Sequence, residues 1–454
     1  MKKNIFYLII LGVFAATSCS KNIELNPLTA IDASVGYPTK SDLDAALNGC
    51  YSSMLSANYL GIRYYALCDL AGDNLTWTGT FVDFSEVNQH LVSTNNASTT
   101  NMWVNVYSGI NRINNVIYSI AKNTDPAVVA NKATYQGEAQ TLRGFQYFNL
   151  LRFFGGSLTS SAYNQAGGLG VPLITNPTLA IADTTSVPRS TEADCWKLVI
   201  SDLKAGVDNL PAKNGTGHVN KYAAEALLAR AYLYTGDWAN AEAAATDVIT
   251  KGGYTLVTGA NYGTIFSAKN SSESIFELQF DSQNQNSTAF FFFKSASGGR
   301  NEINTNTSIA NAHEAGDLRK PVNIAASPVG STLKYTSTAG LDNIIVTRLA
   351  ELYLIRAEAR AKQSNLAGSL ADINIIRTRA GLPLSIAATA ADLMAAIEQE
   401  NRIEFAFEGH RWFDIRRYNK TAAVGVTQGF RVLWPIPQRE VDNSGGVIAQ
   451  TPGY

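Results

Sequence analysis

Residues 222–249 read YAAEALLARAYLYTGDWANAEAAATDVI, the pattern of two amphipathic helices joined by a tight turn at Tyr234–Trp238. The small residues Ala229 and Ala241 stand where the two helices would cross closely. Small residues on one face of a helix allow a second helix to pack closely against that face. This stretch therefore predicts a helical protein whose frame is built from packed helix pairs.

The same arrangement recurs in residues 349–383, which read as a helix, a turn at Ser364-Asn365 and a second helix. Residues 134–154 and 393–418 are two further helical regions. Both helix pairs resemble tetratricopeptide units, and in the first pair the expected positions are held by Leu228, Tyr232, Ala241 and Ala245. We expect a mainly α fold with such pairs as its scaffold.

Two long stretches between the helices, residues 155–189 and 252–300, are rich in turn-forming residues. Within the second, the alternation in residues 274–280 predicts a strand, and four phenylalanines in a row, Phe290–Phe293, suit another buried strand. Long irregular loops on a helical frame are uncommon unless they carry a function. We therefore expect the loops, with short β-hairpins, to carry a function; the family resemblance described below implies that they form the ligand side.

The N-terminus combines a basic start, an apolar core and a run of small residues that ends at Cys19. The core, roughly a dozen residues long, is too short for a bilayer span of about 20 residues. Residues 1–18 therefore have the pattern of a secretory signal peptide. Cys19 directly after small residues is similar to the bacterial lipoprotein box, in which the cysteine is lipidated and begins the mature chain. An ordinary signal peptide with a coincidental cysteine is the alternative.

Domain organisation follows from these patterns. We expect residues 19–27 to be a lipidated tether and residues 28–454 to be a single domain, with an N-terminal part (28–220) and a C-terminal part (221–454). A content of 46% hydrophobic and 16% charged residues in 454 is ample for a large core. The net charge of −1 gives no electrostatic case for nucleic acid.

Three cysteines remain beyond the first, Cys50, Cys68 and Cys195. They allow at most one disulfide, for which Cys50 and Cys68 are the favoured pair, or they stay unpaired as buried thiols. The four histidines lie far apart, without the spacing of metal ligands, and the common nucleophile and phosphate-loop motifs are absent. No metal or cofactor is expected.

Residues 400–417, ENRIEFAFEGHRWFDIRR, hold the one candidate catalytic cluster: Glu404, Glu408, His410 and Asp414. A carboxylate pair beside a histidine could do acid–base chemistry. The same segment also supplies four arginines to pair with those acids, together with several aromatic residues suited to a core. We therefore interpret the cluster as structural and predict that the protein is not an enzyme.

The same segment resembles the ERRxELAFEGxRxxDLRR motif of the SusD/RagB family of outer-membrane nutrient-binding lipoproteins. Further matches follow the family's order along the chain: residues 139–155 (AQTLRGFQYFNLLRFFG), 352–360 (LYLIRAEAR), 373–382 (INIIRTRAGL), 433–440 (LWPIPQRE) and the terminal QTPGY. Each match is weak alone and the set is specific. One departure is Ser20-Lys21-Asn22, where many family lipoproteins carry several acidic residues directly after the cysteine.

The resemblance implies a SusD-like fold and a lipid-anchored, outward-facing protein of the outer membrane. Family members bind an oligosaccharide, or in some cases a peptide, and partner a TonB-dependent outer-membrane transporter of the SusC type. Two other functional classes are the alternatives to a nutrient-binding protein. A tethered hydrolase lacks the nucleophile and metal constellations, and a helical-repeat scaffold without a small ligand would hold only a protein partner.

A sugar-binding surface needs flat apolar faces for the ring and planar polar groups for its hydroxyls. Residues 69–84 offer Trp77 among small and polar neighbours, with Asp73 and Asn74 as hydroxyl partners. We expect the ring of Trp77 to be partly exposed and to centre the ligand platform. Residues 281–300 offer a second mixture, in which Asn284 and Phe290 are the candidates.

Overall fold

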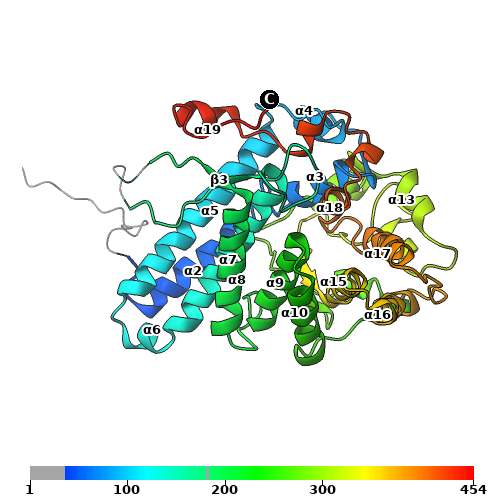
Figure 1. The fold of residues 1–454 in the computed structure, drawn as a ribbon, viewed down its shortest axis with the longest axis horizontal. Helices are drawn as coiled ribbons and strands as arrows, with labels where there is room; N and C mark the ends of the chain where they lie inside the picture. Colours follow the sequence, from blue (N-terminus) through cyan, green and yellow to red (C-terminus); the bar gives the residue numbers. More distant parts are fainter. Residues whose placement is uncertain (1–35, 180–182, 184) are drawn as a thin grey trace, which may run out of the picture.

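The structure is a computed structural model that describes residues 36–179, 183 and 185–454, and it is mainly α-helical (Figure 1). Long helices stand side by side through the middle of the molecule (Figure 1). The short helices α4 (Val82–Asn88) and α19 (Gln438–Asn443) lie along its upper edge, as does the C-terminus (Figure 1). We call the long helices the frame; the short helices and loops lie along one edge of it (Figure 1).

The N-terminal part of the frame is a layer of long helices: α2 (Lys40–Met54), α5 (Ala97–Lys122), α7 (Lys132–Phe154) and α8 (Glu192–Asn209). The chain turns between α5 and α7 through α6 (Pro126–Ala130), and α7 packs against both α5 and α8. Helix α7 is buried on nearly every side, and its Arg143 forms a buried ion pair of 2.8 Å with Asp202 of α8. It is the central helix of this layer.

The expected helix pair at residues 222–249 is α9 (Lys221–Thr235) followed by α10 (Trp238–Lys251). Asn220 begins α9 by accepting the backbone N–H of Ala223 at 2.8 Å. Gly236, at φ 75°, ends it in the left-handed conformation that favours glycine. The side chain of Asp237 then caps α10, so the reversal takes only two residues.

The second expected pair is α15 (Leu349–Lys362) and α16 (Leu366–Arg379), and α10 packs against α15. Helix α17 (Ala390–Glu404) covers α15 next to α16. The described residues are mainly helical, as the sequence predicted.

Residues 393–418 do not form one helix, which corrects the sequence prediction. Helix α17 ends at Glu404, and α18 (Arg411–Arg417) begins after a break that contains Phe407 at φ 67° and Gly409 at φ 77°. A Cβ at position 409 would lie 2.6 Å from Cε1 of Tyr64. The close contact with Tyr64 and the positive φ both require glycine at this position.

Three two-stranded antiparallel sheets join segments far apart in sequence: β1 (Leu75–Trp77) with β5 (Ile303–Thr305), β2 (Leu169–Pro172) with β3 (Arg189–Thr191), and β4 (Ser274–Leu278) with β6 (Ile344–Arg348). The remaining short elements are α3 (Arg63–Leu70), α11 (Thr264–Ser267), α12 (Thr288–Phe292), α13 (Thr307–Ala312), α14 (Lys320–Asn323), and the 3₁₀ turns η2 (Gly259–Asn261), η3 (Ser295–Ser297), η4 (Thr421–Val424) and η5 (Gly429–Val432).

Two local predictions have different outcomes. The strand expected at residues 274–280 is β4, but the phenylalanine run is the short helix α12 rather than a strand. Phe291, Phe292 and Phe293 are buried all the same, since the helix packs into the loop side. The three cysteines of the described part, Cys50, Cys68 and Cys195, are buried and free, so no disulfide forms among them.

Close packing of the helix pair generates a prediction. Ala241 is fully buried on α10, which packs against both α9 and α15, and Ala243 on the same helix is exposed. Ala241→Leu should destabilise the fold by about 1–3 kcal/mol, because the extra carbons have to be forced into a filled interface. Urea unfolding measures the change, and Ala243→Leu is the matched control. Equal stability of the two variants would contradict the close crossing.

Candidate ligand-binding surface and the buried charge network

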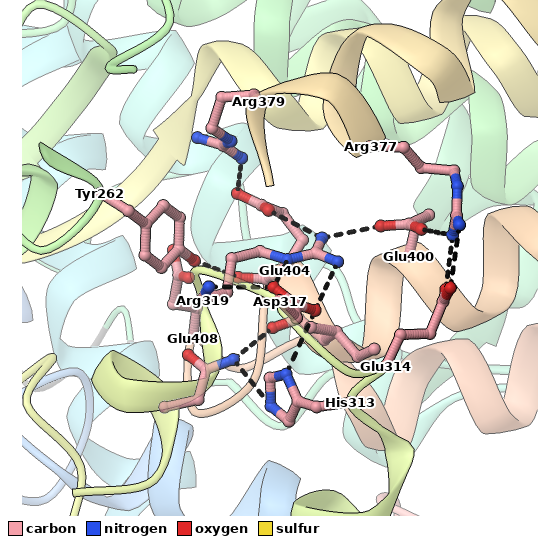
Figure 2. A network of polar contacts seen from close by, with 12 residues as sticks. Tyr262, His313, Glu314, Asp317, Arg319, Arg377, Arg379, Glu400, Glu404 and Glu408 are labelled. Carbon is pink, nitrogen blue, oxygen red and sulfur yellow. Dashed lines mark hydrogen bonds and ion pairs between the residues drawn. The ribbon is translucent and has the colours of Figure 1, made fainter. Parts of the chain in front are cut away.

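Glu400, Glu404 and Glu408 lie in a largely buried network of ion pairs (Figure 2). At its centre are five carboxylates and five bases, each base within 4.0 Å of at least one acid: Glu273, Asp317, Glu400, Glu404 and Glu408 with Arg319, Lys334, Arg348, Arg377 and Arg379. His313 and Glu314 join its edge through Asp317 and Arg377. Charges of both signs alternate through the network, which is how buried charges are tolerated.

Glu404 is the centre of this network. Its carboxylate contacts the guanidinium groups of Arg319, Arg348 and Arg379, and its side chain is fully buried. Arg319 lies between two acids, with Nη1 2.7 Å from Oε2 of Glu400 and 3.3 Å from Oε2 of Glu404 (Figure 2). Burial alone would raise the pKa of Glu404, but the three arginines hold it well below its usual value.

Glu408 and His410 also have contacts that suit a structural role. Glu408 binds Lys334 at 2.6 Å and Arg348 at 2.8 Å, so both of its oxygens are occupied. Burial, with further arginines nearby, holds the pKa of His410 well below its usual value, and its ring stacks on Phe405. Asp414 pairs with Arg417 at 3.0 Å. The cluster therefore holds the fold together, and its buried acids are already paired with bases.

Asp73 and Asn74 serve the same framework, so the hydroxyl-binding role predicted for them is not supported by their positions. Asp73 binds Arg411 through both oxygens, at 2.6 and 2.9 Å. Asn74 is fully buried, donates to Asp69 at 2.8 Å and accepts from Arg402 at 3.0 Å. Both side chains thereby fasten the start of β1 to α17 and α18.

The expected exposure of Trp77 is wrong: its side chain is only 8% exposed. The rings of Phe81, Phe84 and Phe291 surround it, with Phe81 stacked at 6.1 Å and an interplanar angle of 18°. Phe81 and Phe84 follow Trp77 closely, just before and within α4, whereas Phe291 comes from α12, far along the chain. Tertiary contacts bury the ring.

The exposed ring at this place is Phe81, which is 38% exposed and followed by Val82 at 69%. The guanidinium of Arg300 lies over the Phe81 ring, 4.9 Å from its centroid, and pairs with Glu302 at 2.6 Å. We call Trp77, Phe81, Phe291, Arg300 and Glu302 the aromatic surface. It combines an exposed apolar face with a planar cation and a carboxylate.

Three polar atoms at this surface are buried and have no hydrogen-bond partner among the described residues: Nε1 of Trp77, Oδ1 of Asn301 and Oε2 of Glu302. Their residues are neighbours where β1 and β5 pair: Trp77 pairs with Ile303, and the backbone N–H of Thr78 donates to the carbonyl of Glu302 at 2.9 Å. A buried polar atom without a partner is energetically costly.

The second pair of candidates lies near this surface by sequence, and the structure separates them. Phe290 is half-buried and packs edge-on against Phe291 at 5.7 Å, so it borders the aromatic surface. Asn284 lies in a turn in which its backbone N–H donates to Asp281 at 2.8 Å. Sequence reasoning missed Phe81, Arg300 and Glu302, although the quoted stretches 69–84 and 281–300 contained the first two.

Neither a membrane-spanning helix nor a metal-binding cluster occurs among the described residues. Within residues 36–179, 183 and 185–454, no helix combines the length and apolar character needed to span a membrane. The same ranges contain no group of three or more histidine, cysteine, aspartate or glutamate side chains arranged to hold a metal ion.

Comparison with known families gives two matches that together cover most of the chain. The sequence profile of the SusD family matches residues 294–428. A second profile, described as starch-binding associating with outer membrane, matches residues 31–233. The first match includes Arg300 and the charge network around Glu404 except Glu273, and the second includes Trp77 and Phe81.

Individual proteins are similar over their whole length. SusD-like protein P2 of Formosa agariphila is 26% identical, with 100% of each chain covered, and SusD-like protein P38 of the same organism is 24% identical, with 97% of each covered. A crystal structure of a SusD superfamily protein from Bacteroides vulgatus superposes with a TM-score of 0.79 and 27% identity, covering 92% of this chain and 100% of that one.

The network predicts a stability effect without a chemical one. Glu404→Ala should cost roughly 3–5 kcal/mol, because three buried guanidinium groups lose their shared acid. Thermal unfolding measures the loss, and Asp208→Ala, which breaks the exposed pair with Lys204 on α8, is the control that should change little. A Glu404→Ala protein as stable as the parent would contradict the structural role.

Proposed function

Because the chain belongs to the SusD/RagB family, we propose that it is a non-catalytic binding protein that captures an oligosaccharide at the cell surface and delivers it to a TonB-dependent outer-membrane transporter. One matched profile is described as starch-binding associating with outer membrane, which supports a glycan as the ligand class. The observation that carries the proposal is the aromatic surface with its unpartnered polar atoms.

The chemistry of that surface fits a sugar. The Phe81 ring, which is 38% exposed, offers apolar surface to the C–H side of a pyranose next to the guanidinium that lies over it. Arg300 and Glu302 lie at its border and offer a planar donor and an acceptor for hydroxyl groups. Trp77 supports Phe81 from below, so the platform is stiff before any ligand arrives.

Anchoring is proposed through Cys19, which lies outside the described residues. Small residues before the cysteine and the polar stretch after it support lipidation followed by a short tether. The family supplies two parts of this proposal: the outer membrane as the location and a SusC-type transporter as the partner. The description of the matched profile names the outer membrane.

A peptide ligand on the same surface is the nearest alternative, and a scaffold role for the helix pairs without any small ligand is the other. The aromatic surface favours the sugar, because it places a planar guanidinium and a carboxylate beside a partly exposed ring. Titration against both oligosaccharides and peptides separates these outcomes, and a protein that binds neither yet retains its transporter would be a scaffold.

Phe81→Ala should weaken glycan binding by at least roughly tenfold, about 1.4 kcal/mol, with little change in melting temperature, since a ring exposed at 38% leaves no closed cavity. Trp77→Ala should weaken binding and also lower the melting temperature, because the buried ring supports the platform. Calorimetric titration with a panel of oligosaccharides, and thermal melts of the same samples, make the measurement.

Leu91→Ala is the matched control, because Leu91 is 51% exposed and belongs to no part of the aromatic surface. It should bind as the parent does. Unchanged glycan affinity in Phe81→Ala would place the ligand elsewhere on the loop side.

Cys19→Ser should fold and leave the membrane fraction, because each buried acyl methylene contributes about 0.8 kcal/mol to anchoring. Membrane fractionation of cells that lack the transporter makes the test clean, since the transporter could hold the protein by itself. Retention of Cys19→Ser in the outer membrane of such cells would contradict lipid anchoring.

A further inference from the structure

A cavity of about 430 Å³ lies beside β4, away from the elements that build the aromatic surface. Its walls are the loop Lys213–His218, in which Lys213 is exposed, the N-cap of α9 at Asn220, Tyr254, Asn270 and the strand residues Ser274–Glu277. Helix α9 and strand β4 position these walls, whereas β1, β5, α4 and α12 position the aromatic surface. The cavity therefore needs its own explanation.

Its walls are held in place by hydrogen bonds of their own. Asn214 donates to Glu138 at 2.8 Å and to the carbonyl of Val219 at 2.9 Å. Nδ1 of His218 lies 2.6 Å from Oε1 of the same Glu138, so this base is already matched with an acid. The loop is thus fixed against α7.

Glu277 is the unusual group in this cavity. Its side chain is 97% buried at 3% exposure, and its Oε2 accepts the backbone N–H of Asn270 at 2.9 Å and the amide of Asn343 at 2.8 Å. Its Oε1 is buried without a hydrogen-bond partner in the described ranges, and there no base lies within 4.0 Å of the carboxylate. Ser274, on the same strand, has a buried hydroxyl that also lacks a partner.

The contrast with Glu273, which precedes β4, shows what is missing. Both oxygens of Glu273 bind guanidinium groups, Oε1 that of Arg348 at 2.7 Å and Oε2 that of Arg379 at 3.1 Å. A buried carboxylate without a cation is costly, and proteins pair nearly all such groups. Glu277 has only neutral amide donors among the described residues, and it lines a cavity open to solvent.

We propose that this cavity is a second ligand site, which binds a primary ammonium group through Oε1 of Glu277. The ammonium supplies the missing charge and donates to that oxygen, while the hydroxyl of Ser274 accepts or donates a further bond. Tyr254 and the polar loop Asn214–His218 border the remaining volume, which suits a small hydroxylated amine such as an amino sugar. The site is distinct from the glycan-binding surface proposed above.

Titration calorimetry of the full protein at pH 6.5, with glucosamine, glucose and N-acetylglucosamine as probes, tests the proposal. The three sugars share a ring, and only glucosamine carries an ammonium group. Glucosamine should bind at least tenfold more tightly than either neutral sugar. Equal affinity for glucosamine and glucose would overturn the proposal, because charge would then not decide binding.

Two variants make the assignment to this cavity. Glu277→Gln keeps the shape and removes the charge, so glucosamine affinity should fall at least tenfold, while Asp281→Asn, an exposed acid beyond the same strand, should leave it unchanged. Thr216→Trp fills the cavity from its exposed loop without touching the carboxylate, and it should also abolish binding. Glucosamine binding that survives in either Glu277→Gln or Thr216→Trp would place the amine elsewhere and overturn the site.

Discussion

Glu404 is enclosed by three guanidinium groups inside the protein, and this arrangement has to form as a unit. Burying a charge costs several kcal/mol unless its partners are in place, so an incomplete network would be worse than none. The arginines come from three separate places: Arg319 before α14, Arg348 at the end of β6 and Arg379 at the end of α16. Their convergence joins the helix pairs to the loop side.

The same region positions the aromatic surface through a second set of polar contacts. The break after α17 places the backbone N–H of Phe407 3.2 Å from Asp69, which in turn accepts from Asn74. Arg402 and Arg411 then hold Asn74 and Asp73 at the beginning of β1. The platform of Trp77 and Phe81 follows directly, so a loop that carries the ligand surface is fixed by charges on the frame.

The helical frame provides stability, and the loops carry the groups proposed to bind ligands. Apolar and small residues are buried on α7, α9, α10 and α15, and their close packing fixes where these helices lie. The two proposed binding sites lie instead where short strands from distant segments pair, at β1 with β5 and beside β4. In the part of the chain that the structure describes, both places hold buried polar atoms without a hydrogen-bond partner.

The sequence alone determined the helix pairs, because small residues at crossing points and capping residues at turns act locally, as at Ala241 and Asn220. It also determined the family, whose motif in residues 400–417 belongs to the charge network. It did not determine which side chains are exposed. Trp77 has polar residues on both sides in sequence; the nearby Phe84 and the distant Phe291 bury it, while Phe81 is exposed. Burial depends on how segments pack in three dimensions, so only the tertiary structure decided the aromatic surface and, among the described residues, the unpaired carboxylate of Glu277.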